Sequence, residues 1–314
     1  MTSRQGNLAA LFVWPILMKI DTHQHFWRYQ SDEFPWISES MPILRQDRMP
    51  QDSQSANQAC GVDAVVAVQA RGVVQETDFL MELAARESRI LGVVGWVDLA
   101  SDKLNEQLDR WAGKSALRGF RHILQDEPDI ATLIESPAFN RGVSMLQKRQ
   151  LVYDVLVFGH QLPVAMDFCR RHDNHWLVLD HVGKPAVRNW SRDAQVEKDW
   201  SARIRELAAM PHVMCKLSGL VTEADWQGNQ GLQPADQRVI HACFDLALDA
   251  FGPERIMFGS DWPVCELVTD YSSVHSIAQN WASASLGESG QQAFWAGNAV
   301  RCYDLHTPMG EPVI

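Results

Sequence analysis

The sequence is poor in cysteine, with only six in 314 residues and no Cys-x-x-Cys pair. The six are Cys60, Cys169, Cys215, Cys243, Cys265 and Cys302. Cysteines scattered without regular spacing argue against a disulfide framework and against a zinc ribbon. We therefore expect reduced thiols, as in a cytoplasmic protein.

Basic residues are outnumbered: 28 lysines and arginines face 39 aspartates and glutamates, which gives a formal net charge of −11. An acidic surface disfavours nucleic acid and anionic membranes as partners. A small molecule stays open as the ligand, because a site sets its own local field. The oligomeric state also stays open, since nothing in the sequence identifies an interface.

A long apolar run is missing as well. The best candidate, Leu8–Met18, is too short to span a bilayer and contains Pro15. It has only Arg4 as a basic flank and is followed by no small-x-small cleavage site. We predict that residues 1–17 form a non-native or disordered extension, with Met18 as the natural start, and that residues 18–314 form a single domain.

Short apolar segments alternate with amphipathic ones along the chain. Between the apolar segments, hydrophobic residues recur every three or four positions, which is the period of an amphipathic helix. The apolar segments are nearly continuous, as is typical of parallel strands covered on both faces. They span residues 19–26, 62–70, 90–99, 117–124, 151–158, 176–182, 212–217 and 255–260.

Eight strand–helix repeats predict a single-domain α/β fold, the (β/α)8 TIM barrel. An open doubly wound sheet is the alternative, but it favours a glycine-rich phosphate turn, and no G-x-G-x-x-G occurs. The longest loop, residues 27–61, follows the first strand. We expect this loop to cover the active site.

Polar side chains stand where the predicted strands end. His23 and His25, in "KIDTHQHFW", are two positions apart and share one face of the first strand. His122 ends the fourth strand, His181 the sixth and Asp261 the eighth. Two histidines alone are also typical of a protein core. Because the carboxyl ends of barrel strands surround one pocket, we expect the full set to meet there.

The motifs around these residues resemble those of the amidohydrolase superfamily. They are "HQH", "DHVGKP" and "GSDWP", joined by "GVVGWVDL", "GFRHILQDEPD", "YDVLVFGHQLP" and "CKLSGLVTEADW". Together they extend from Met18 to about Leu305. Within the superfamily, these motifs are most similar to those of sugar-lactone hydrolases of the L-fuconolactonase and L-rhamnonolactonase type. The resemblance implies a hydrolase of carbohydrate catabolism whose partner is a small sugar lactone.

The sequence departs from two-metal members of the superfamily. Those use a carbamylated lysine on strand four and a histidine on strand five, where this chain offers His122 and Asp154. The resemblance therefore implies either one divalent ion or a metal-free site. Zinc suits the donors of the first alternative. Its ligands would be His23, His25 and Asp261, with or without His181.

The chemistry of a lactone, which is a cyclic ester, indicates roles for these groups. We predict that Asp261 is the general base for water, and that His181 and His122 donate hydrogen bonds to the carbonyl oxygen. The alternative is metal-dependent decarboxylation of a small unsaturated acid, which in related barrels uses a strand-five histidine absent here. A non-catalytic barrel is a third possibility, but it would not be expected to keep all these groups.

A second set of residues is predicted to bind the substrate, although each has a structural alternative. An aromatic beside the histidines could stack on a sugar ring or seal the barrel. Charged or polar residues at strand ends could contact the substrate or cap neighbouring elements. The set comprises Trp27, Gln69, Arg71, Asp154 and Lys184, with Lys216 and Ser218 on one face of the seventh strand as further candidates.

Overall fold

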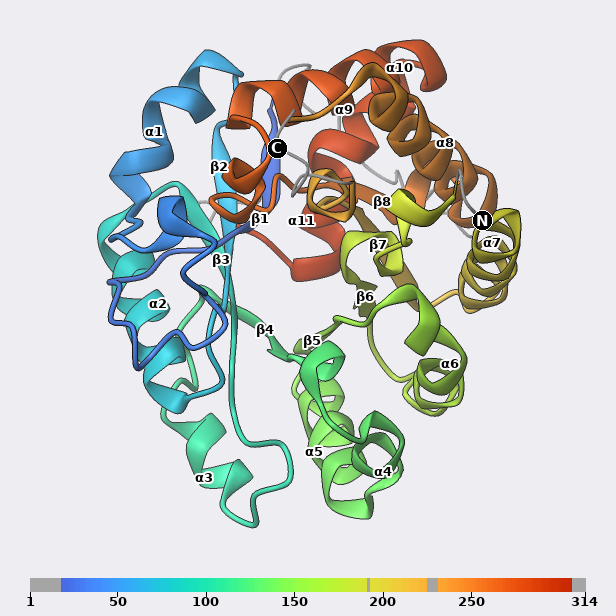
Figure 1. Ribbon diagram of the computed structural model, residues 1–314. Coiled ribbons are helices and arrows are strands. Elements are labelled where there is room, and N and C mark those ends of the chain that lie inside the picture. Colours follow the sequence, from blue (N-terminus) through green and yellow to red (C-terminus); the bar gives the residue numbers. More distant parts are fainter. Residues whose placement is uncertain (1–17, 191–192, 225–230, 307–314) are drawn as a thin grey trace, which may run out of the picture.

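The computed structural model describes residues 18–190, 193–224 and 231–306. Within these residues, eight parallel strands pair in sequence order into one sheet. The sheet curls into a barrel with helices outside it (Figure 1). This confirms the predicted (β/α)8 architecture. The strands are β1 (Ile20–Gln24), β2 (Ala64–Val68), β3 (Ile90–Gly95), β4 (Leu117–His122), β5 (Val152–Val155), β6 (Leu177–Leu179), β7 (Val213–Leu217) and β8 (Ile256–Phe258).

Helices follow the strands and cover the outside of the sheet, with additional helices after β4 and β8. Their amphipathic spacing in the sequence is borne out by burial: Ile240, Cys243 and Ala247 all face the core. The helices are α1 (Pro50–Ala59), α2 (Val74–Arg86), α3 (Leu104–Asp109), α4 (Ile130–Glu135), α5 (Pro137–Lys148), α6 (Leu162–Arg171), α7 (Ala194–Ala208), α8 (Pro234–Phe251), α9 (Tyr271–Ser285), α10 (Glu288–Gln292) and α11 (Asn298–Tyr303).

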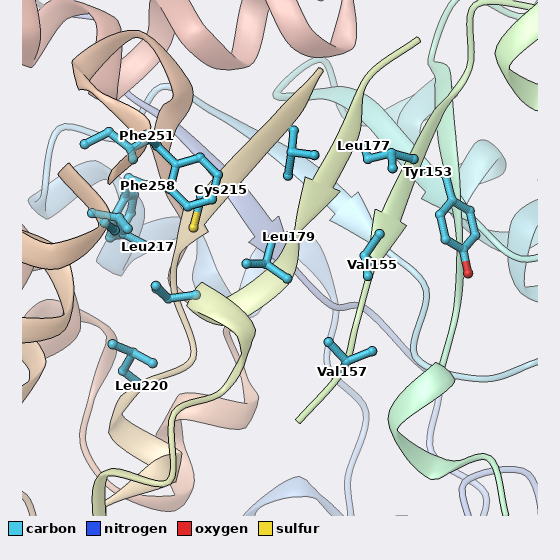
Figure 2. Packing of buried hydrophobic residues seen from close by; sticks show 14 of the residues in the cluster. Tyr153, Val155, Val157, Leu177, Leu179, Cys215, Leu217, Leu220, Phe251 and Phe258 are labelled. Atoms are coloured by element: carbon cyan, nitrogen blue, oxygen red, sulfur yellow. The ribbon is translucent and has the colours of Figure 1, made fainter. Parts of the chain in front are cut away.

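Side chains alternate between the two faces of the sheet, and both faces are buried. Tyr153 and Val155 of β5 belong, with Leu177 and Leu179 of β6, to the cluster that packs between sheet and helices (Figure 2). The intervening residues point into the barrel, where Val152, Val178, Met214 and Met257 pack with residues of α11. Burial on both faces explains why the strands are nearly continuous apolar segments.

The carboxyl ends of β1 and β8 are joined by hydrogen bonds that help to close the barrel. Thr22 Oγ1 donates to the carbonyl oxygen of Phe258 at 2.6 Å. The backbone N–H of Asp261 donates to the carbonyl oxygen of His23 at 2.9 Å, and that of His25 to Trp262 at 2.7 Å. Barrel closure itself therefore brings the histidine pair next to Asp261.

The predicted segments differ from the observed elements mainly at their ends. All eight strands are present, but most are shorter than their apolar segments. The prediction of a loop over residues 27–61 is wrong in part, because Pro50–Ala59 form α1. Pro50 at its first position and the Asp52 carboxylate, which accepts from the N–H of Met49 at 2.7 Å, start this helix.

Two further expectations concern the membrane and the amino terminus. Among the described helices, none combines the length and the apolar character needed to cross a membrane. The prediction that residues 1–17 form a non-native or disordered extension lies outside the described residues.

His172, directly after α6, gives a testable prediction about stability. Its Nε2 lies 2.9 Å from Asn140 Oδ1, whereas its buried Nδ1 has no hydrogen-bond partner among the residues that the structure describes. Burial lowers the pKa of His172 from 6.5 to about 4. Between these values the unfolded chain binds a proton that the folded chain does not. The stabilisation from a neutral His172 is therefore complete above the unfolded pKa and is lost as the pH falls towards 4.

When the pH is lowered from about 7 to about 5, we expect the free energy of unfolding to fall less for His172→Gln than for wild type. The reason is that the variant has no imidazole to titrate at this position. Urea denaturation at both pH values measures the two losses. Equal losses in the two proteins would contradict this account of His172.

Candidate active site

A cavity of about 350 Å³ opens at the carboxyl ends of the strands. This is the face of the barrel at which the sequence analysis placed the polar strand ends. Polar groups from several strands and loops reach it. They include His25, Arg121, His181, Lys184, Glu223 and Asp261.

The carboxylate of Asp261 is the centre of the cluster at the floor of the cavity. Its Oδ1 lies 3.3 Å from Nε2 of His25 and 3.7 Å from Nε2 of His23. Nε2 of His181 is 3.8 Å from the same oxygen. All four side chains are buried. The structure thus brings together four of the five residues that were expected to meet.

His181 is held in place by an uncommon backbone conformation after β6. Its φ is 54°, and Val182 follows at 52°. Such left-handed angles cost non-glycine residues on the order of 1–3 kcal/mol each and persist only where the surroundings impose them. Here the indole of Trp200 donates to the carbonyl oxygen of Val182 at 3.0 Å. This backbone conformation turns the His181 ring towards Asp261.

The two residues directly after β7, Ser218 and Gly219, further constrain the His181 ring. Nδ1 of His181 lies 2.9 Å from Oγ of Ser218, which fixes one edge of the imidazole. Gly219 packs against the same edge, so closely that a Cβ at this position would collide with Nδ1. Gly219 also has a φ of +64°, which side chains rarely adopt. Ser218 and Gly219 therefore leave the ring a single orientation.

Beneath the histidines lies a buried network of four charged side chains. Lys216 Nζ is 2.5 Å from Asp154 Oδ2 and 3.1 Å from Asp180 Oδ1. Arg121 donates to Asp180 Oδ2 at 2.9 Å. Both cations also contact His23: Arg121 lies 3.2 Å from its Nε2 and Lys216 lies 3.3 Å from its Nδ1. Pairing is what makes this burial of charge tolerable.

The surroundings fix the charge of the cluster at neutral pH. Burial raises the pKa of Asp261, but His181, His25 and His23 outweigh burial and hold that pKa below its ordinary value. Burial lowers the pKa of His181 to about 4, although Asp261 opposes this change. Burial also lowers the pKa of His23. Asp261 is therefore a carboxylate beside neutral His181 and His23.

His122 does not join the cluster, so the expectation that it lies at the pocket floor is wrong. It shares the outward face of β4 with Phe120, because alternate residues of a strand point the same way. Its ring contacts Phe139, with centroids 5.6 Å apart, and its Nε2 lies 2.6 Å from Glu127 Oε1. The inward position at this end of β4 belongs to Arg121.

The predicted substrate-binding residues divide between three places. Lys184 lines the cavity. Trp27, Gln69 and Asp154 are completely buried and do not line it, so their predicted structural alternatives match the structure better than contact with substrate. Arg71 lines a neighbouring cavity and pairs with Glu76 at 2.8 Å.

Several residues at the cavity or beneath it were not predicted from the sequence. Arg121 and Asp180 directly precede the predicted site residues His122 and His181, and strand alternation could have identified both. Trp36, Arg188 and Glu223 reach the cavity from loops. Trp36 belongs to the segment 27–61 that was expected to cover the site, whereas no sequence pattern placed Arg188 and Glu223 there.

The donor set fits one metal ion. Ligand atoms of His23, His181 and Asp261 all lie within 4.8 Å of one another. Nδ1 of His25 lies 2.8 Å from the carbonyl oxygen of Val68, so in the neutral ring this nitrogen is the donor and the Nε2 lone pair faces Asp261. The Nε2 lone pair and the Asp261 carboxylate are then both acceptors, and a proton or a cation between them would satisfy both. A backbone carbonyl on the far nitrogen is also typical of metal-binding histidines.

Comparison with known proteins identifies the family. The sequence model of the amidohydrolase family matches residues 20–305. This chain belongs to the amidohydrolase family. The matched stretch contains all eight strands and the whole Asp261 cluster, as the resemblance of the sequence motifs predicted.

Two curated amidohydrolase relatives carry the name L-fucono-1,5-lactonase. The protein from Burkholderia multivorans is 52% identical over 291 residues, covering 93% of this chain and 97% of the relative. The protein from Burkholderia ambifaria is 32% identical over 296 residues, covering 93% and 98%. A crystal structure of a Burkholderia multivorans amidohydrolase with bound zinc is 51% identical, has a TM-score of 0.88, and aligns over 92% of this chain and 100% of that one.

Proposed function

We propose that this amidohydrolase opens a sugar lactone of the L-fucono-1,5-lactone type to the sugar acid. The observation that carries the proposal is the carboxylate of Asp261, which lies within 3.8 Å of three imidazole nitrogens at the floor of the cavity. The proposal is supported by the 52% identity to a relative named for this activity. An L-rhamnonolactone belongs to the same substrate class.

The first step is attack of water on the lactone carbonyl carbon. Asp261 accepts a proton from the water as the new carbon–oxygen bond forms. The hydroxyl of Ser218 donates to Nδ1 of His181, which leaves the proton of the neutral ring on Nε2. This N–H donates to the carbonyl oxygen as negative charge develops there. The ring ester bond then breaks, and Asp261 returns its proton to the leaving ring oxygen.

Two cations at the cavity complement the carboxylate that the reaction creates. Lys184 and Arg188 both line the cavity, and Glu223 lies between them, 3.9 Å from Lys184 Nζ and 3.8 Å from an Arg188 nitrogen. The cations attract the developing acid, whereas the carboxylate of Glu223 accepts hydrogen bonds from sugar hydroxyls. This mixture suits a polyhydroxylated lactone better than an apolar ester.

A divalent ion, when bound, would be held by His23, His181 and Asp261. Nε2 of His181 would then be a ligand instead of a hydrogen-bond donor, and the ion would supply the Lewis-acid polarisation of the carbonyl in its place. We expect Zn²⁺ to raise the Tm of the chelator-treated wild type, because an ion that binds only the folded chain stabilises it by about 2.7 kcal/mol at 100 times its Kd. Differential scanning calorimetry measures the rise. The Tm of Asp261→Asn should rise less, since one ligand is weakened; no rise in wild type, or equal rises, would contradict this site.

The substrate is tested by a screen with a pH indicator, corrected for spontaneous hydrolysis. The panel contains L-fucono-1,5-lactone, L-rhamnonolactone, pentonolactones and an unsaturated dicarboxylate lactone, each with and without prior chelation. We expect rapid turnover of a six-carbon deoxy-sugar lactone. Release of carbon dioxide from a small unsaturated acid, with no lactone turned over, would instead favour a decarboxylase.

A further inference from the structure

A second cavity, here called the annex, adjoins the Asp261 cavity. It has a volume of about 890 Å³. Trp36, Ala70, Ile123 and Asp126 line both cavities and form a shared rim between them. None of the steps of lactone opening uses the annex. A single six-carbon lactone over Asp261 would leave it unfilled.

The wall of the annex carries an ordered aromatic side chain with an unused donor. Thr77 holds the backbone of Trp96 through two hydrogen bonds of 2.7 Å, one to its N–H and one to its carbonyl oxygen. Gly72 packs beneath the indole, where a Cβ would come within 3.3 Å of Nε1. Among the described residues, no partner accepts a hydrogen bond from the Trp96 indole N–H. Trp96 therefore offers the annex an aromatic surface and a donor.

His122 and Glu127 provide polar groups beside this ring. Their 2.6 Å contact fixes both side chains, and the His122 ring lies 6.4 Å from the Trp96 ring at an angle of 34°. Both residues are only partly buried, so their remaining polar atoms are accessible from the annex. The outward turn of His122 thus gives the annex a hydrogen-bonding side chain.

The charge of the annex disfavours an anionic ligand. Among the described residues, four carboxylates line it, from Asp32, Glu33, Asp126 and Glu127, against one guanidinium, that of Arg71. Arg71 already pairs with Glu33 and with the buried Glu76. A neutral ligand with many hydroxyl groups suits this lining, because carboxylates accept from hydroxyls and an aromatic face packs on the apolar face of a sugar.

We propose that the annex is a subsite for a neutral glycosyl group carried by the lactone, so that the enzyme also opens lactones of glycosylated sugar acids. This inference rests on the proposed lactonase function. The bond changes are those of the unsubstituted substrate: water adds to the carbonyl carbon, the ring ester bond breaks, and the glycosidic bond stays intact. The shared rim lets the two sugar units occupy the two cavities at once.

The test compares the best lactone of the screen with the same lactone carrying one neutral hexosyl group, placed on each free hydroxyl in turn. Wild type is compared with Trp96→Ala and Glu127→Gln. Trp176→Ala is the matched control, because Trp176 is half-buried but lines neither the annex nor the Asp261 cavity. Melting temperatures confirm that each variant is folded.

Wild type should hydrolyse at least one glycosylated lactone with kcat/KM within about threefold of the parent. Trp96→Ala and Glu127→Gln should each lower that value by about tenfold, which corresponds to the loss of one good contact, while changing the parent lactone less than twofold. Rejection of every glycosylated lactone by wild type, or equal losses on both substrates, would overturn the subsite. Failure of the parent lactone itself would overturn the lactonase function instead.

Discussion

Replacing Asp261 by asparagine should lower kcat/KM for the lactone by about 10²–10⁴, or roughly 3–5 kcal/mol of transition-state stabilisation. The amide has nearly the shape of the carboxylate but cannot accept the proton of the attacking water. Asparagine also tolerates the φ of 62° at this position. The backbone N–H that bonds to His23 is unaffected by the change. The variant should therefore fold and lose its activity.

Steady-state kinetics on purified protein measure this loss, and circular dichroism with a thermal melt verifies the fold. Asp249→Asn is the matched control, because Asp249 is an exposed residue of α8 that pairs with Arg205 and does not line the cavity. We expect the control to keep wild-type kcat/KM. An Asp261→Asn protein that also keeps it would remove the general base from the mechanism.

Gly219→Ala should lower kcat/KM by about 10²-fold, since displacing a catalytic group by about 1 Å is sufficient for such a loss. The added methyl group would collide with Nδ1 of His181 and force the ring away from Ser218. His181 then no longer presents its Nε2 proton to the carbonyl oxygen. Gly219 does not touch the substrate in this account and acts only through the position of His181.

Gly113→Ala separates this collision from backbone strain. Gly113 also has a positive φ, +76°, but a Cβ there would meet nothing within 4 Å. Both substitutions cost roughly 1–2 kcal/mol of conformational strain. Only Gly219→Ala should impair kcat/KM, measured with the same lactone. Equal kinetic losses, or a fully active Gly219→Ala protein, would contradict the proposed constraint on His181.

The fold could be predicted from the sequence because its signals repeat. Eight apolar segments separated by helical periods leave few alternatives, and packing on both faces of each strand makes these segments easy to see. Their ends were less predictable, as in β6, where the predicted segment 176–182 ends at Leu179. After Leu179 the sequence shows no regular pattern of apolar residues. His181 and Val182 nevertheless adopt left-handed backbone angles, which no periodicity reveals.

The site was predictable where strand ends or barrel closure set it. His23, His25, His181 and Asp261 lie together as expected. The error at His122 has a physical cause. Every polar residue at a strand end was expected to point into the pocket, but side chains alternate along a strand, so Arg121 points inward and His122 points outward. Arg188 and Glu223 could not be predicted, because tertiary packing of loops rather than local pattern brings them to the cavity. Trp36 does lie in the segment 27–61 that was expected to cover the site, although no pattern singled it out.

The central claim is that the Asp261 cluster hydrolyses a sugar lactone. The most direct test is the initial rate of L-fucono-1,5-lactone opening at neutral pH, for wild type and Asp261→Asn side by side, after subtraction of spontaneous hydrolysis. The account predicts saturable, rapid hydrolysis by wild type and a rate near background for the variant. No rate above background in wild type, or equal rates in the two proteins, would contradict it.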